Sequence, residues 1–308
     1  MWKSRRVVVS GALVAVAIAA VIGAALPVSV WLRSFSRTNP VDVTAAANWV
    51  RPVSGGVAVI AMLVLLSDRL KRIVFSRGCL FAFPLICIVL FIWFKRSAGR
   101  ENAVYLWAAR EDSIIEYATA LSFFIAVPVS VYVARYAARL HLRLAALFHL
   151  ALAAVMTVMG LEEISYGQRI FGFETPPTIA QDNTQGEFNF HNLASMKWLA
   201  DNVAPTIIIY WGVFGFLGIM LSRILFSNRS KWYDTAKLML PPWYLLTFFL
   251  PLPLWADHSW WGYAVWQDQE IAEMFLGMAF LLFSLNSLQG VGQSSAARSE
   301  PFLKGRVT

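Results

Sequence analysis

The chain alternates between long apolar runs and short polar segments, and this pattern predicts a bundle of about eight helices. The apolar runs cover residues 7–31, 48–66, 78–94, 114–134, 144–161, 204–222, 238–256 and 270–289. Each run is close to the ~20 residues that a helix needs to cross the hydrocarbon layer of a membrane. Backbone groups must pair within a segment in that layer, which favours helices. We therefore expect an all-α, polytopic transmembrane bundle in which residues 1–293 form a single integral membrane domain.

Two polar segments and the first apolar run complete the predicted organisation. Residues 162–203 form the longest polar connection and are predicted as a loop on the outer face. Residues 294–308 are polar and predict a flexible cytoplasmic tail. The run at 7–31 follows the basic start MWKSRR, as in a signal peptide, but exceeds the roughly 7–15 apolar residues typical of such peptides. We expect this run to be retained as the first span, with cleavage as the alternative.

The composition and charge agree with a membrane protein. Hydrophobic residues make up 58% of the 308 residues and charged residues only 14%, against about 25% charged in soluble proteins. Most of the 26 Lys and Arg residues fall in segments on the same side as the N-terminus, which predicts that both termini are cytoplasmic. This asymmetry also explains the net charge of +8, so we expect no nucleic-acid partner.

Most acidic residues fall on the opposite, periplasmic side, and two acidic clusters lie at predicted helix starts. Glu111, Asp112 and Glu116 precede or begin the fourth span, where a capping box could account for them. Glu270 and Glu273 begin the eighth span and share one helical face because they are three residues apart. Glu273 lies a turn deeper, so we expect it to face the bundle interior or a wet cavity.

A third cluster, Glu162 and Glu163, lies at the end of the fifth span, where the helix dipole disfavours acids. These carboxylates need a partner, which could be Arg169, a metal ion or a shared proton. The helix could also continue to Phe171. In that case Glu162, Ser165 and Arg169 would share one face, and an internal ion pair would be the structural alternative.

A fourth cluster is the amide-rich loop that contains Asn189, His191 and Asn192. Such a loop is often only solvated, and Asn192 could cap a following helix. Carboxylates together with an imidazole could instead bind a divalent metal such as Zn²⁺, Mn²⁺ or Fe²⁺, although the spacing matches no established metal motif. His149 is 13 residues from Glu162, roughly 20 Å along a helix, and therefore cannot belong to the same site.

A longer motif surrounds these residues. The stretch GLEEISYGQRIFGFETPP, followed by NTQGEFNFHNL, resembles the signature of an uncharacterised family of bacterial polytopic membrane proteins. The EDSIIEY and QEIAE helix starts are similar to that family as well. The resemblance implies a multi-pass protein of the bacterial cytoplasmic (inner) membrane and implies no activity.

Together these patterns predict an acidic site at the periplasmic face. The predicted catalytic residues are Glu116, Glu162, Glu163, Glu273 and His191, and the predicted substrate-binding residues are Ser165, Gln168, Arg169, Asn189 and Asn192. A divalent metal would be held by Glu116, Glu163, Glu273 and His191. The first hypothesis is an enzyme acting on a membrane lipid or lipid-linked substrate, with one glutamate as general base. The alternatives are a cation- or proton-coupled transporter and a scaffold protein, and the protein partner is left open.

Overall fold

The computed structural model describes residues 76–98, 114–183, 186–226, 230–252 and 268–304. The predicted spans at 7–31 and 48–66 lie outside these ranges. The chain divides into two compact units, residues 1–80 and 81–308. All helices discussed below belong to the second unit, apart from the first turn of α5.

Within the described ranges the chain is helical and forms no β-strand. Four of the helices in the described part of the chain are long and apolar enough to cross a membrane. They are α7 (Ile114–Arg139), α8 (Arg143–Glu163), α11 (Ala204–Leu225) and the first part of α15 (Asp268–Lys304). A further helix, α5 (Arg77–Ala98), has a shorter apolar segment. The predicted spans at 78–94, 114–134, 144–161, 204–222 and 270–289 lie within these five helices.

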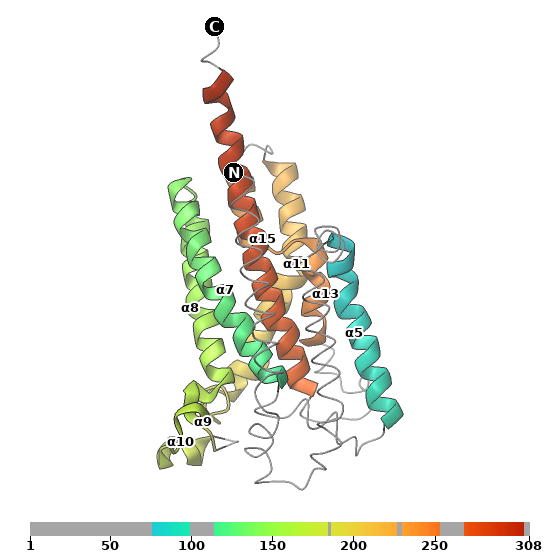
Figure 1. The fold of residues 1–308 in the computed structure, drawn as a ribbon, viewed down its shortest axis with the longest axis vertical. Helices are drawn as coiled ribbons and strands as arrows, with labels where there is room; N and C mark the ends of the chain where they lie inside the picture. The colour runs from blue at the N-terminus through green and yellow to red at the C-terminus, as the bar shows by residue number, and fades with distance from the viewer. Residues whose placement is uncertain (1–75, 99–113, 184–185, 227–229, 253–267, 305–308) are drawn as a thin grey trace, which may run out of the picture. The chain divides into compact units, whose positions relative to one another are not determined.

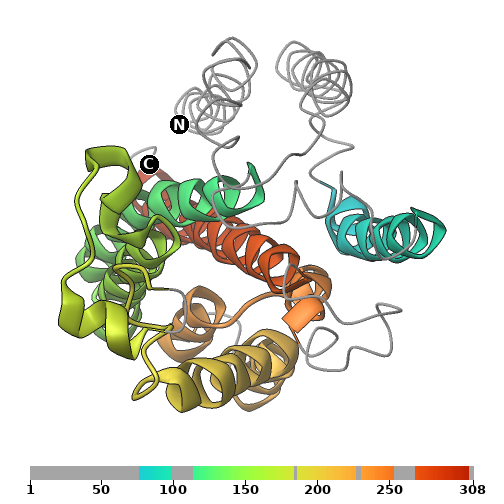
Figure 2. The same ribbon diagram turned by 90° about the horizontal axis from the view of Figure 1, so that it is seen from below.

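Helix α7 packs against both α8 and α15, and this three-helix unit holds the candidate site described below (Figure 1 and Figure 2). Two glycines allow the close approach. A Cβ atom on Gly277 would lie 3.1 Å from the backbone oxygen of Thr119, and one on Gly160 would lie 2.9 Å from the ring of Phe124. Fully buried Phe123, Met156 and other apolar side chains fill the space between the helices.

Aromatic rings form a layer across the interior of the bundle. Phe123 of α7 lies 6.0 Å from Phe280 of α15, measured between ring centroids. Trp211 of α11 stacks on Phe280 at 5.5 Å and contacts Phe283 at 4.9 Å. Phe123, Phe280 and Phe283 are each at most 3% exposed. We call these three rings together with that of Trp211 the aromatic layer.

The predicted span at 238–256 is not one helix. Helix α12 (Lys231–Met239) ends before Leu240, which is extended at φ −117° and ψ 136°. The chain resumes in η3 (Trp243–Leu245) and α13 (Leu246–Phe249). The cause is Pro241–Pro242, since proline lacks an N–H, clashes with the preceding turn and pushes the residue before it into extended conformations.

Side chains from other helices form hydrogen bonds with the backbone carbonyl groups at this interruption. His149 Nε2 lies 2.8 Å from the oxygen of Leu238, and Trp211 Nε1 donates to the oxygen of Met239 at 2.9 Å. His149 is completely buried, and its Nδ1 has no hydrogen-bond partner in the part of the chain that the structure describes. The histidine thus completes the end of α12 in the bundle interior, where free carbonyl groups are costly.

The outward faces of the helices carry large apolar side chains. Leu147 on α8 is 65% exposed and Ile224 on α11 is 78% exposed. These residues belong to longer exposed rows, which include Leu144, Leu150, Val155 and Val158 on α8 and Ile207, Tyr210, Phe214, Leu217 and Leu221 on α11. Apolar surfaces of this extent are rare in soluble proteins and are typical of lipid-facing helices.

Helix α15 differs from the prediction at its end. The apolar part extends to Gly292, and the helix continues to Lys304. The segment predicted as a polar, flexible tail from Ser294 is therefore helical over most of its length. Its residues, including Ala296, Ala297 and Arg298, have good helix propensity, which the hydropathy pattern alone does not register.

Candidate functional site

Three carboxylates converge where the end of α8 meets the start of α15. Glu163 is the last residue of α8, and Glu270 and Glu273 lie in the first two turns of α15. One oxygen from each lies within 4.8 Å of the others. Glu270 is only 8% exposed, and the other two are partly buried. We call Glu163, Glu270 and Glu273 the carboxylate triad.

Three ionised carboxylates at this separation would repel one another, although Gln269 donates a hydrogen bond to Glu273 at 2.7 Å. Two unit charges about 4.8 Å apart repel by roughly 3–4 kcal/mol at an effective dielectric constant of about 20. The charge of Glu116, in the first turn of α7, also acts on Glu163. The N-termini of α7 and α15 favour their own acids, whereas Glu163 lies at the disfavoured C-terminus of α8. A bound cation or bound protons would relieve this repulsion, and three carboxylate oxygens are suitable ligands for a divalent ion.

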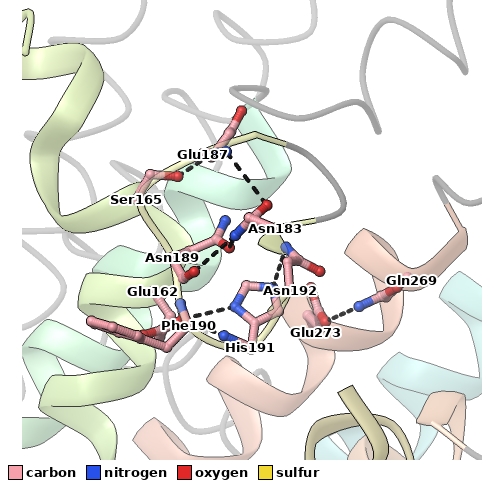
Figure 3. Close-up of polar contacts among 10 residues, drawn as sticks. All are labelled: Glu162, Ser165, Asn183, Glu187, Asn189, Phe190, His191, Asn192, Gln269 and Glu273. Carbon is pink, nitrogen blue, oxygen red and sulfur yellow. Dashed lines mark hydrogen bonds and ion pairs between the residues drawn. The ribbon is translucent and has the colours of Figure 1, made fainter. Parts of the chain in front are cut away.

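Glu162 points away from the triad although it is the neighbour of Glu163. Adjacent helix positions differ by about 100° in direction, and the Glu162 carboxylate faces the loop that follows α8. Its Oε2 accepts from the backbone N–H of Phe190 at 2.7 Å and of His191 at 2.9 Å, and it pairs with His191 Nδ1 at 2.9 Å (Figure 3). The Glu162 side chain is 12% exposed.

This pairing defines the orientation of the imidazole. An ionised carboxylate only accepts hydrogen bonds, so Nδ1 of His191 carries the proton and Nε2 is the basic nitrogen. The amide of Asn192 lies 3.0 Å from Nε2 through its Nδ2, which can donate to it (Figure 3). Glu162 and His191 therefore form a carboxylate–imidazole pair of the kind that positions a histidine for proton transfer or metal binding.

A left-handed turn brings the loop back to Glu162. Ser165, Tyr166 and Gly167 have φ values of 45°, 53° and 79°, and the two non-glycine residues each cost about 1–2 kcal/mol in this region. The turn ends α8 before the short helix α9 (Gln168–Phe171). The alternative in which the helix continues to Phe171 is therefore wrong, and with it the shared helical face for Glu162, Ser165 and Arg169. Within the described contacts, the partner of Glu162 across the loop is His191.

Hydrogen bonds between side chains and backbone hold the rest of the loop. Ser165 donates to Glu187 at 2.6 Å. Gln168 donates to Thr175 and accepts from the backbone of Phe188, both at 2.8 Å. The loop continues through α10 (Pro177–Asp182) to a bridge between Asn183 and Leu193. Near this bridge Asn183 donates to both the backbone and the side-chain oxygen of Asn189.

Aromatic rings reinforce the same loop. Tyr166 contacts Phe188 and Phe190 edge to face, with ring centroids 5.7 and 5.4 Å apart, and Phe173 contacts Phe188 at 5.7 Å. The Tyr166 hydroxyl also hydrogen-bonds to Glu162. Burial, this hydrogen bond and the nearby carboxylate together raise the pKa of Tyr166 above its ordinary value. The phenol therefore remains a donor to Glu162 over the whole physiological range.

The structure divides the predicted site residues into three groups. Glu163 and Glu273 belong to the triad, with Glu116 near enough to act on Glu163. Glu162, His191 and Asn192 form the neighbouring polar group. Ser165, Gln168 and Asn189 bond within the loop, and the side chain of Arg169 lies outside the described residues.

Sequence reasoning left two contributors out of the predicted site. One is Glu270, which belongs to the triad. Its spacing of three residues from Glu273 places both on one helical face, and this spacing is the sequence signal for its role. The other is Tyr166, whose contact with Glu162 depends on the left-handed turn. No sequence pattern marks that turn beyond the glycine at its end.

The fold and the site define a membrane protein whose described part is all-helical and that carries an acidic cluster at one end of its bundle. Comparison of the chain with protein-family models, with curated proteins and with solved structures gives no match.

Proposed function

We propose that this protein is a multi-pass enzyme of the bacterial cytoplasmic membrane, with both termini in the cytoplasm. It would act on a membrane lipid or lipid-linked substrate at its periplasmic face, with a divalent cation at the carboxylate triad. The observation that carries the proposal is the position of Glu162 and Glu163. These two residues are neighbours at the end of one apolar helix. Glu163 belongs to the carboxylate triad, and Glu162 orients His191.

The roles of the residues follow from their contacts. Glu163, Glu270 and Glu273 would hold the cation, which supplies positive charge for an anionic group of the substrate. His191 would accept or donate a proton at Nε2 once the substrate displaces the Asn192 amide. Glu162 would act as a positioning residue, because its oxygens already accept hydrogen bonds from the loop and from Tyr166.

A second candidate, cation- or proton-coupled transport, has one observation in its favour. Helix α12 is interrupted in the bundle interior, and interrupted helices often line transport sites. Buried His149, whose Nδ1 has no hydrogen-bond partner among the described residues, lies beside the interruption. The aromatic layer weighs against a continuous polar path. Phe123 and Phe280 lie seven residues beyond Glu116 and Glu273 on their helices, roughly 10 Å along each axis.

Cation binding tests the proposal directly. The full chain in lipid nanodiscs would be titrated with Mn²⁺ and followed by electron paramagnetic resonance. We expect about one bound Mn²⁺ in the wild type and at least a tenfold loss of affinity in Glu163→Gln and Glu273→Gln. Glu174→Gln, a change at an exposed loop glutamate, serves as the matched control and should bind as the wild type does. Absence of binding in the wild type, or equal binding in Glu163→Gln, would overturn the cation site.

The enzymatic part needs a separate measurement. Wild-type and Glu163→Gln proteins would be incubated with total bacterial lipid extract and Mn²⁺, and the products followed by mass spectrometry. A lipid product formed only by the wild type and Glu174→Gln supports an enzyme. Cation binding without any product, together with uptake of Mn²⁺ into proteoliposomes, would favour the transporter.

A further inference from the structure

Large apolar side chains project from the polar loop at two separate places. Phe171 at the end of α9 is 80% exposed and Phe173 is 39% exposed. Trp198, shortly before α11, is 70% exposed, and its neighbours Met196 and Leu199 are 41% and 44% exposed. Tyr166 and Phe188, which contact each other within the loop, are only partly exposed, whereas Phe190 is also 41% exposed. The five side chains at these two places are thus more exposed than Tyr166 and Phe188.

Both places lie close in sequence to the end of a membrane-length helix. Phe171 follows the end of α8 by eight residues, and Trp198 precedes the start of α11 by six. Both α8 and α11 are membrane-length apolar helices. The 21 residues of α8 rise by roughly 31 Å, close to the ~30 Å thickness of the hydrocarbon layer. In a bilayer of this thickness, the residues just beyond these two helix ends would lie at headgroup level.

The segment before α11 continues the lipid-facing row of that helix. Exposed apolar residues on α11 follow each other at intervals of three or four, as in Ile207, Tyr210 and Phe214. Leu199 precedes Ile207 by eight residues, and the π-helical turn η2 (Leu199–Val203) takes up the additional residue. Leu199 thus extends the same face, and Trp198 lies beside it at the position where tryptophan is enriched in membrane proteins.

We propose that the loop between α8 and α11 is seated in the phospholipid headgroup layer through Phe171, Phe173, Met196, Trp198 and Leu199. The occupant of this surface is lipid, because the exposed side chains lie close in sequence to the ends of two spans and Leu199 continues the outer face of α11. The seating holds the Glu162–His191 pair at headgroup depth. This deepens the proposed function, on which it rests for catalysis, by naming the polar headgroup of a phospholipid in the same leaflet as the substrate class.

Spin-label accessibility measures the depth of the loop without relying on activity or on a cation. Cys79 and Cys87 would be replaced by serine, and the full chain labelled at Phe171→Cys or Trp198→Cys in phosphatidylcholine nanodiscs. Ile207→Cys on the outer face of α11 gives the lipid reference, and Gln181→Cys on exposed α10 gives the water reference. Met196→Cys replaces position 198 if the tryptophan variant does not fold.

We expect labels at positions 171 and 198 to contact oxygen more than water-soluble nickel, at depths of about 5–10 Å into the headgroup boundary. The label at position 181 should show the reverse preference. Nickel access at 171 and 198 equal to that at 181 would overturn the proposal. Exclusion of both reagents would also overturn it, since a protein would then cover the surface. Failure here leaves Mn²⁺ binding at the triad unaffected, so the two proposals can fail separately.

Discussion

Removing the Glu162 carboxylate should release the loop that carries His191. In Glu162→Ala the backbone N–H groups of Phe190 and His191 lose their acceptor, and the imidazole loses its partner. A hydrogen bond to a charged group contributes about 1.5–3 kcal/mol. Water would recover part of the three that are lost, so we expect local opening to become easier by roughly 3 kcal/mol. Because 1.4 kcal/mol corresponds to a factor of ten, the opened population should rise roughly 100-fold.

Hydrogen–deuterium exchange followed by mass spectrometry measures how often the loop opens at the amides of Phe190 and His191. Peptides covering residues 186–193 should exchange roughly 100-fold faster in Glu162→Ala than in the wild type. The amides of Ala180 and Asn183, which bond within and after α10, provide an internal reference and should change much less. Glu174→Ala removes an exposed loop glutamate and is the control variant. Unchanged exchange at Phe190 and His191 in Glu162→Ala would refute the positioning role of Glu162.

Two further predictions concern packing and pH. Gly277→Ala places a Cβ 3.1 Å from the backbone oxygen of Thr119, so the variant should lose about 1–3 kcal/mol of stability, seen as a lower Tm. The control Gly78→Ala, with nothing within 4 Å, should not be destabilised, and equal Tm values for the two variants would contradict the close α7–α15 contact. The raised pKa of Tyr166 means that its stabilising effect is complete below about pH 10 and is lost as pH rises further. Between about pH 10 and 12 the wild type should therefore lose more stability than Tyr166→Phe, and parallel curves would contradict the Tyr166–Glu162 hydrogen bond.

The helices were predictable where hydropathy alone determines them. Spans four, five, six and eight agree with α7, α8, α11 and the apolar part of α15 because each is a long apolar run without a pair of adjacent prolines. The run at 238–256 is equally apolar, but Pro241–Pro242 overrides hydropathy by removing N–H donors and excluding helical geometry at Leu240.

The candidate site was predictable in composition and less so in arrangement. Acids at the starts of α7 and α15 and at the end of α8 follow from the order of the spans, since these ends share one side of a bundle. Which carboxylate faces which neighbour depends on helix rotation and on the left-handed turn at Ser165–Gly167. His191 is 29 residues from Glu162, and only the folded loop brings them together.

Because Glu162 and Glu163 are adjacent, the contacts of α8 with the loop and with α15 both depend on the rotation of α8 about its axis. If α8 turned about its own axis, the carboxylate of Glu163 would leave Glu270 and Glu273 while that of Glu162 left the amides of Phe190 and His191. A cation bound between Glu163 and α15 would therefore oppose the rotation of α8 that would release the loop. Through α8, a change in either contact would affect the other. Deleting one residue within α8 ahead of this pair would move each carboxylate by about 100° and dismantle both contacts at once.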